Sequence, residues 1–515
     1  MRKWLPLVAI CLGTFMLLID VTIVNVALPD MAVDLSTSFS SLQWVIDIYA
    51  LVLAALLLGA GSISDIIGRR LVYIAGLLLF ALASLASGLA PNATFLIVAR
   101  GVQGVGAAAM FATTVALINA SYTGKDRGVA YGVWGAVSGA AAATGPIVGG
   151  LLTDTLSWRW IFFVNLPVSV AAIALSLMVL DGSRGEHRAR IDLPGMFAFT
   201  ASASLITYGF IRAGSDGWLT GTTLGLIGGG VLALVLFIIV ELRTPQPLLD
   251  LGLFSDRRFV GVMIAALFLS LTAFSYLAYS SIWLQSVIGL SPIQAGLVFL
   301  PLSLAAFTVS ASIGRVLHSA NPRWLIGFGL LLIGFGGLAQ AFLKADSSWP
   351  SLLFGLLLVG IGVGLVNPTM ASAVMSAVPM QRGGMAAGAM NTARQLGFAF
   401  GIALLGTIFQ SRIAHEFSGH AIPGGGDIAA AVSGGQAQAV MGAAPAARRD
   451  ELSQLVHQAF ASGLNTIFIV AGVLALAAGA AVLVLLRPAA QPASDSAFGT
   501  PAGIVPAGVP KASGG

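Results

Sequence analysis

The chain has 515 residues, of which 57% are hydrophobic and 9% are charged, and its mean hydropathy is +0.94. A soluble domain is about 25% charged, and apolar side chains in this proportion need a lipid phase as well as a protein core. The composition therefore excludes a soluble enzyme and a disordered protein. The net charge of +5 is attributed to Lys and Arg in cytoplasmic loops, not to nucleic-acid binding.

Reactive side chains for other functions are scarce. Cys11 is the single cysteine, which excludes an intrachain disulfide and a thiolate metal site. Asn119 stands where a phosphate-binding Gly-x4-Gly-Lys-Ser/Thr loop needs its first glycine, so ATP hydrolysis is not expected. The five histidines lie in or beside polar stretches: His187, His318, His415, His420 and His457. We therefore expect no cofactor, no metal and no enzyme activity.

Long apolar stretches recur along the chain, and a membrane-spanning helix needs about 20 such residues. We predict fourteen spans, in chain order 5–28, 43–63, 71–90, 95–118, 129–152, 161–180, 193–211, 219–241, 259–283, 293–316, 323–343, 350–374, 385–409 and 460–486. The first is too long for the core of a signal peptide and carries Asp20, so we expect it to remain in the mature protein.

The loops between the spans indicate orientation and domains. With the N-terminus inside, most of the 25 Lys and Arg residues fall on the cytoplasmic side, which places both termini in the cytoplasm. A six-span bundle is expected at 1–180 and a second at 259–487, the latter with a long external loop at 410–458. Residues 181–258 form a charged linker with two extra spans, and 488–515 a disordered cytoplasmic tail rich in Pro, Ala, Gly and Ser.

Three ionisable residues lie inside the spans of the first bundle, where charge is costly and points to function. Counted along their helices, Asp20, Asp47 and Arg100 all fall in the outer half, within about 5–12 Å of one face. A carboxylate beside a guanidinium could exchange a proton, and a structural ion pair is the alternative. Arg394 in the second bundle has a weaker case, because the amides beside it could make it a structural polar patch.

Glycine is abundant, and many pairs have the small-xxx-small spacing that lets helices approach closely. Gly145 and Pro146 inside a predicted span are more informative, because proline removes a backbone hydrogen bond and bends the helix. Such a bend is useful in a helix that must move, although many bent helices never do.

Five motifs in order resemble the major facilitator superfamily, and two of these resemble signatures of its fourteen-span drug:proton antiporters. The stretch 61–70 (GSISDIIGRR) is similar to the cytoplasmic signature loop, 96–106 to the proton-linked arginine motif and 132–150 to the antiporter motif, in which Ala141 replaces the usual glycine. The stretches 20–29 and 158–167 (WRWIFFVNLP) are similar to the two antiporter-family signatures. In the second half only Gly314–Arg315 remains of the signature loop, without a match for Asp65.

The resemblance implies an all-α membrane fold of two six-helix bundles with two inserted helices, and it implies roles for particular residues. Proton coupling is expected at Asp20, Asp47, Arg100 and Gln103. Conformational gating is expected at Gly61, Asp65, Gly68, Arg69, Arg70, Gly145, Pro146, Gly149 and Gly150. Asn25, Trp134, Tyr276, Tyr279 and Trp283 are candidates for binding substrate, although aromatic residues in spans more often pack or anchor.

The expected function is proton-coupled export of small hydrophobic or cationic compounds, such as drugs and antibiotics, by alternating access across the inner (cytoplasmic) membrane. Its partners would be the substrate, protons and the lipid bilayer, with the chain acting as a monomer. Export of an endogenous metabolite is the alternative. Uptake is disfavoured by the motif around Pro146, and a membrane-embedded enzyme or receptor by the lack of a catalytic group in the spans.

Overall fold

The computed structural model describes residues 2–180, 192–245, 247–313, 321–378, 383–418, 425–445 and 448–487. Helices make up nearly all of these segments, and no strand occurs in them. The fold class predicted from the sequence is therefore confirmed. Three predictions fall outside the described residues: most of the linker, at 181–191, the pair Gly314–Arg315, and the tail at 488–515.

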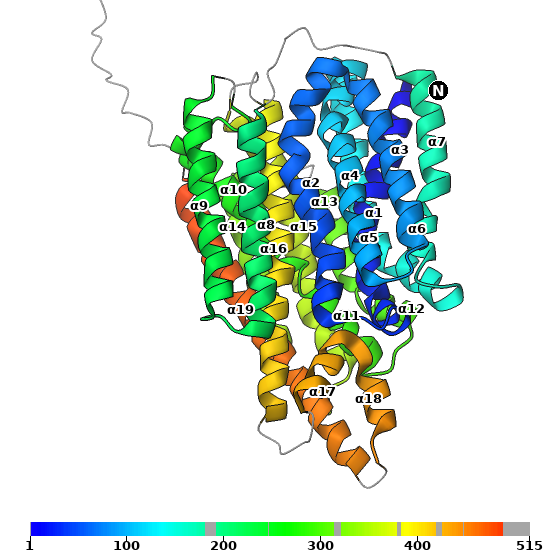
Figure 1. Cartoon of the computed structure of the whole chain (residues 1–515). Helices are drawn as coiled ribbons and strands as arrows, with labels where there is room; N and C mark the ends of the chain where they lie inside the picture. Colours follow the sequence, from blue (N-terminus) through cyan, green and yellow to red (C-terminus); the bar gives the residue numbers. More distant parts are fainter. Residues whose placement is uncertain are drawn as a thin grey trace, which may run out of the picture.

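The first bundle holds six of the predicted spans (Figure 1). Its helices are α1 (Leu5–Asp34), α2 (Phe39–Ile67), α3 (Arg69–Gly88), α4 (Ala93–Ser121), α5 (Gly124–Thr155), and the short α6 (Trp160–Phe163) followed by α7 (Asn165–Val179). Capping side chains define where two of these helices begin. The Ser38 side chain accepts a hydrogen bond from a backbone N–H group in the first turn of α2, and the Asn92 side chain does the same for α4. Gly68, with φ +108°, turns the chain between α2 and α3.

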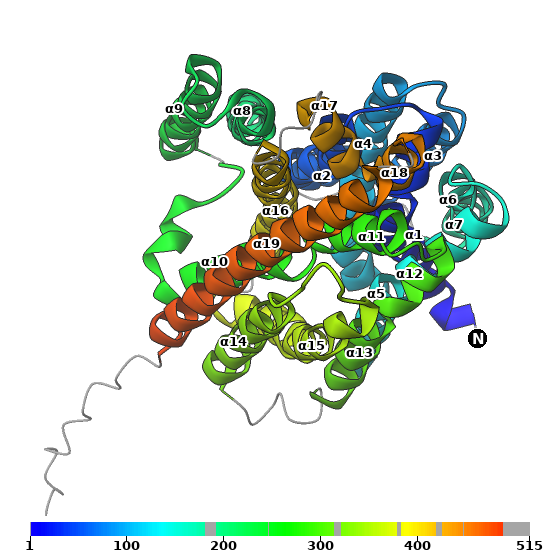
Figure 2. The ribbon, with the colours of Figure 1, turned by 90° about the horizontal axis from the view of Figure 1, so that it is seen from below.

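The second bundle follows the inserted helices. It comprises α10 (Arg257–Ala273), α11 (Leu277–Ser286), α12 (Pro292–Val298), α13 (Leu300–Ile313), α14 (Pro322–Gln340), α15 (Leu353–Ser376), α16 (Gly383–Ser418) and α19 (Arg449–Leu485), with short 3-10 turns at Leu251–Ser255 and Trp349–Leu352. The inserted pair, α8 (Leu193–Asp216) and α9 (Gly221–Arg243), lies at the edge of the molecule (Figure 2). Helix α8 contacts α2 of the first bundle and α16 of the second.

Residues between α16 and α19 form a compact cap on one end of the molecule (Figure 1). The cap consists of α17 (Gly425–Ala431), the π-helical turn η5 (Val432–Gln436) and α18 (Ala437–Ala443). We call this the cap end, and the end where α1 begins and α19 finishes the terminal end. Turn η5 is buried against α1, α2 and α11, so the cap contacts both bundles.

Twelve helices of the described segments are long and apolar enough to cross a membrane, and α12 with α13, bent by 41°, makes a thirteenth if counted as one span. Each of the fourteen predicted stretches coincides with a helix or a helix pair. Helix α5, which covers the predicted span 129–152, is not among the thirteen. The count of fourteen spans thus stays a prediction.

The two bundles meet mainly in the half of the molecule near the cap. Gln285 on α11 donates to the carbonyl oxygen of Val26 on α1 at 2.8 Å. Gln43 on α2 donates to the carbonyl oxygen of Ile402 on α16 at 3.2 Å. One buried apolar cluster also combines side chains of α1 and α2 with side chains of α11 and α16. These contacts close the cap end.

Candidate functional site

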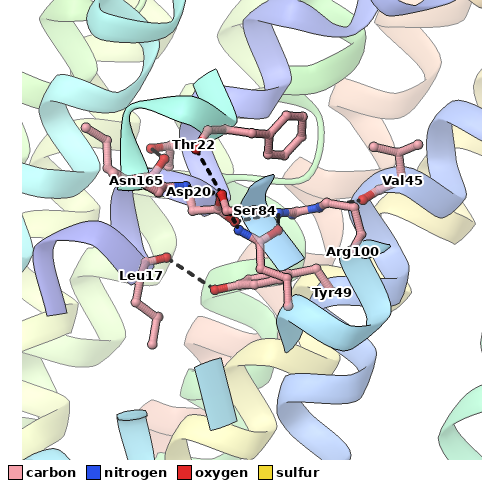
Figure 3. A network of polar contacts seen from close by, with 11 residues as sticks. Leu17, Asp20, Thr22, Val45, Tyr49, Ser84, Arg100 and Asn165 are labelled. Carbon is pink, nitrogen blue, oxygen red and sulfur yellow. Dashed lines mark hydrogen bonds and ion pairs between the residues drawn. The ribbon is translucent and has the colours of Figure 1, made fainter. Parts of the chain in front are cut away.

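A buried ion pair lies in the middle of the first bundle (Figure 3). Arg100 Nη1 on α4 lies 2.5 Å from Asp20 Oδ2 on α1, and their side chains are 1% and 0% exposed. The sequence predicted that these two residues meet, and the structure brings them together. Removing one partner of a buried ion pair typically destabilises a protein by about 3–5 kcal/mol, because the other charge is left uncompensated.

Two amide side chains extend the ion pair into a network. Gln103 Nε2 and Asn165 Nδ2 both donate to Asp20 Oδ1, at 3.0 and 3.2 Å. Both amides also donate to Ser84 Oγ, at 3.3 and 2.9 Å. Ser84 in turn donates to the carbonyl oxygen of Phe162 at 3.0 Å. The network thus joins α1, α3, α4, α6 and α7, and it places Gln103 beside the ion pair.

Arg100 is held on its other sides by α2 and by its own helix. Its Nε donates to the carbonyl oxygen of Val45 at 3.2 Å, and Nη1 also donates to Gln103 Oε1 at 2.8 Å. The guanidinium lies 4.3 Å from the centre of the Tyr49 ring, a cation–π contact. The Tyr49 hydroxyl donates to the carbonyl oxygen of Leu17 on α1 at 3.4 Å. These contacts hold the guanidinium in place beside Asp20.

Asp47, the third ionisable residue expected at this depth, does not join the network. It lies one turn after Gln43 on α2, on the side that meets α16 of the other bundle. The side chain is 0% exposed, and neither carboxylate oxygen has a hydrogen-bond partner among the described residues. The buried Tyr279 on α11 lies within electrostatic reach. Asp47 is therefore a separate buried carboxyl group between the bundles.

The glycines of the antiporter-like motif make the tightest helix contacts of α5. A Cβ on Gly149 would lie 2.7 Å from the carbonyl oxygen of Ile23 on α1, and a Cβ on Gly145 would collide with Thr22. Adjacent Gly150 faces the other bundle, where a Cβ would lie 2.5 Å from the carbonyl oxygen of Pro292 on α12. Pro146 lies inside α5. Gly296 of α12 packs against its carbonyl group so closely that a Cβ on Gly296 would collide with the carbonyl oxygen.

The loop between α2 and α3 lies at the terminal end. Arg70 Nη2 donates to the carbonyl oxygen of Leu177 on α7 at 2.5 Å, so it ties α3 to its own bundle. Arg69 is partly buried at the start of α3. Gly61 has open space at its Cβ position. Close helix packing therefore does not explain the glycine at this position. The Asp65 side chain lies outside the described residues.

A cavity lies between the two bundles. Its apolar lining comes from Leu18, Val21, Val26, Phe111, Pro146, Phe274, Leu277, Phe299, Leu302 and Phe398, and its polar lining from Thr22, Asn25, Ser270, Ser303, Asn391, Arg394 and Gln395. Both bundles contribute, through α1, α4 and α5 on one side and α10, α11, α13 and α16 on the other. A concave, mostly apolar site with a few polar groups is the usual form of a small-molecule site.

Of the five candidates for substrate binding, Asn25 lines this cavity, and the four aromatic residues do not. Trp134 donates to Thr14 on α1 at 3.0 Å. Tyr279 and Trp283 on α11, and Tyr276 just before it, are at most 2% exposed and belong to the core of the second bundle. Aromatic composition alone could not separate packing residues from cavity residues.

Sequence reasoning missed Ser84, Tyr49 and the part that Asn165 plays beside Asp20. Asn165 belongs to the stretch 158–167, whose resemblance to a family signature was the available signal. For Ser84 and Tyr49, which are common residue types in packed helices, the sequence carried no signal. Arg394, for which the sequence left a structural polar patch as one reading, lies on the cavity wall together with Asn391 and Gln395.

Comparison with known proteins agrees with this architecture. The multidrug resistance protein Stp of Mycobacterium tuberculosis is 35% identical over 417 residues, covering 81% of this chain and 78% of that protein. The puromycin resistance protein pur8 of Streptomyces alboniger is 38% identical over 426 residues, covering 81% of this chain and 84% of that protein. The tetracenomycin C resistance and export protein of Streptomyces glaucescens is 31% identical over 513 residues, covering 97% of this chain and 95% of that protein.

A solved structure shares the fold at low sequence identity. It is a bacterial homologue of the human lysosomal transporter Spinster in an inward-facing, unoccupied conformation, with a TM-score of 0.64 and 17% identity, covering 94% of this chain and 97% of that one. The sequence profile of the Major Facilitator Superfamily matches residues 10–402. The relatives are transporters and not enzymes, and the chain belongs to the Major Facilitator Superfamily.

Proposed function

We propose that this drug-efflux transporter is driven by protons, which bind at Asp20 and are exchanged for small, largely apolar compounds. The observation that carries the proposal is the buried Asp20 carboxylate, which receives N–H groups from Arg100, Gln103 and Asn165. An ionisable group at this depth is a functional candidate by default. The proposal includes alternating access across the cytoplasmic membrane, by one chain with both termini inside the cell.

The donors around Asp20 explain how proton binding would move helices. As an anion, Asp20 only accepts hydrogen bonds, and it is matched by three donor groups from α4 and α7. A protonated Asp20 adds a fourth donor to a site that already holds three, and it removes the counter-ion of Arg100. The network must therefore rearrange, and α1, α4 and α7 carry that rearrangement to the bundle surface.

Asp47 is the second proton site in this proposal. Its carboxyl group has no described partner and lies where α2 meets α16. Separation of the bundles on opening of the cap end would expose it, and their closure would bury it again. Its protonation would thus be linked directly to the conformational change, whereas Asp20 acts through a network inside one bundle.

The test measures export by the full-length protein in proteoliposomes under an imposed pH gradient. Asp20→Asn is expected to abolish gradient-driven export while the protein stays folded in the membrane. Asp34→Asn is the matched control, because Asp34 lies on the same helix and pairs with Arg159 at the surface, where ion pairs contribute about 0–1 kcal/mol. Normal export by a well-expressed Asp20→Asn protein would refute the role of Asp20, and a parallel loss in Asp47→Asn would transfer it to Asp47.

A further inference from the structure

The cavity between the bundles carries a positive charge without a counter-charge. Arg394 on α16 lines it, and among the lining residues in the described segments none is Asp or Glu. No hydrogen bond or ion pair is recorded for Arg394 within the described structure. Arg100, the other arginine deep inside a bundle, is paired with Asp20. The two interior arginines therefore differ in that the cavity arginine lacks a protein anion.

An uncompensated guanidinium at membrane depth is costly, and such groups commonly face a binding site or an aqueous cavity. A guanidinium has five N–H donors in a planar fork that matches a carboxylate in two parallel hydrogen bonds. It accepts no hydrogen bond and repels cations. The chemistry of Arg394 thus favours a ligand that brings an anionic or strongly accepting group.

The neighbouring residues complement such a ligand. Asn391, one turn before Arg394, and Gln395, next to it, place amide donors at the same wall. The opposite wall of the cavity, on α1, carries Asn25, whose Oδ1 has no partner among the described residues. The phenyl ring of Phe398, one turn after Arg394 on the same helix, belongs to the apolar part of the lining. Polar groups and apolar surface thus stand side by side.

We infer that the cavity selects amphipathic compounds that carry a negative charge, a carboxylate or a phenolate on an apolar aromatic body, with Arg394 as the anion-binding residue. This inference rests on the proposed efflux function and specifies its cargo. It opposes the cationic part of the sequence-based expectation, because the first charge that a cation would meet in the cavity is that of Arg394. Neutral apolar compounds would bind through the rings alone.

The test compares three fluorescent probes with one apolar body and three charges: 1-pyrenebutyrate, 1-pyrenebutanol and a pyrenebutyl-trimethylammonium salt. Equilibrium binding to purified full-length protein in nanodiscs is measured by energy transfer from tryptophan, with empty nanodiscs subtracted for lipid partitioning. The anion is expected to bind most tightly and the cation least. Loss of a charge-assisted hydrogen-bonded pair should weaken pyrenebutyrate binding to Arg394→Gln by about 10- to 100-fold, with pyrenebutanol unchanged.

Two further variants separate recognition from structure. Arg394→Lys keeps the charge and loses the fork, so it should retain part of the preference for the anion. Arg412→Gln is the control, because Arg412 is a half-exposed arginine further along α16 that pairs with Glu416. Equal affinity of the wild type for the cation and the anion would overturn the inference. So would an unchanged anion-to-neutral ratio in Arg394→Gln, or an equal loss of all three probes.

The binding assay contains no gradient, so its outcome is independent of proton coupling. If the charge preference holds and Asp20→Asn still exports pyrenebutyrate normally under a pH gradient, the coupling proposal fails and the inference stands. If export is gradient-driven and the cation is the preferred probe, the inference fails and the coupling proposal stands.

Discussion

Two adjacent glycines on α5 allow the closure of the cap end to be perturbed in a controlled way. Gly150 faces α12 of the other bundle, and a Cβ there would lie 2.5 Å from the carbonyl oxygen of Pro292 and 2.6 Å from Cα of Ile293. Gly149 faces α1 of its own bundle, and a Cβ there would lie 2.7 Å from the carbonyl oxygen of Ile23. The same substitution at both positions therefore crowds two different interfaces.

Overpacking of this kind costs about 1–3 kcal/mol. In Gly150→Ala the clash is relieved when the bundles separate at the cap end, so the cost falls on the closed state alone. A bias of about 1–3 kcal/mol changes the ratio of two conformations by roughly 5- to 150-fold. Gly149→Ala crowds a contact that exists in both conformations, and it should lower stability without shifting the ratio.

Spin labels at Thr94 and Ser348 report on the opening, because both residues are exposed near the cap end, one on each bundle. The labels require Cys11 to be replaced by serine, since it is the single native cysteine. Electron–electron distance measurements should show a larger long-distance population in Gly150→Ala than in the parent protein, and an unchanged distribution in Gly149→Ala. Identical distributions in all three proteins would refute the assignment of Gly150 to the moving interface.

Three other predictions concern separate parts of the chain. Arg100→Lys should keep partial efflux and Arg100→Ala lose it, because lysine keeps the positive charge beside Asp20 but lacks the planar fork of the guanidinium; transport rates of the two variants in proteoliposomes measure both effects. Asp65→Ala should bind a fluorescent substrate normally but turn over slowly, as equilibrium binding and transport rates would show. Gly435→Ala should loosen the cap, since φ is +91° there and a side chain costs about 1–2 kcal/mol, visible as faster hydrogen exchange over 425–445 with the bundles unchanged.

The sequence predicted where the helices run and how deep a residue lies along each of them, because both can be counted along the chain. It placed Asp20 with Arg100 correctly on this basis. For Asp47 it gave a depth along the helix, which says nothing about the direction in which the side chain points around that helix. The carbonyl oxygen of Val45 accepts from Arg100, whereas Asp47, two residues later, lies on the side of α2 that meets the other bundle. The direction of a side chain around the axis of α2 is set by the packing of this helix between α4 and α16, which only the structure shows.

Other features depend on contacts that have no local signature. The span predicted at 259–283 is broken between α10 and α11, where Phe274 to Tyr276 leave the helix. The predicted external loop 410–458 contains the helical cap and the extensions of α16 and α19. The described part of this stretch is helical, and Gly434 and Gly435 of η5 lie against Pro29, Phe39 and Ile282.

The position of the cap offers a way to hold the two bundles together. Both ends of the cap are attached to the second bundle through α16 and α19, yet η5 rests on α1 and α2 of the first. In the predicted orientation the cap faces the medium, where an antibody fragment reaches it without entering the lipid. A fragment whose epitope spans the cap and the end of α1 on which η5 rests would fasten the two bundles together. Such a molecule is far larger than the cavity, so the transporter has no means of expelling it.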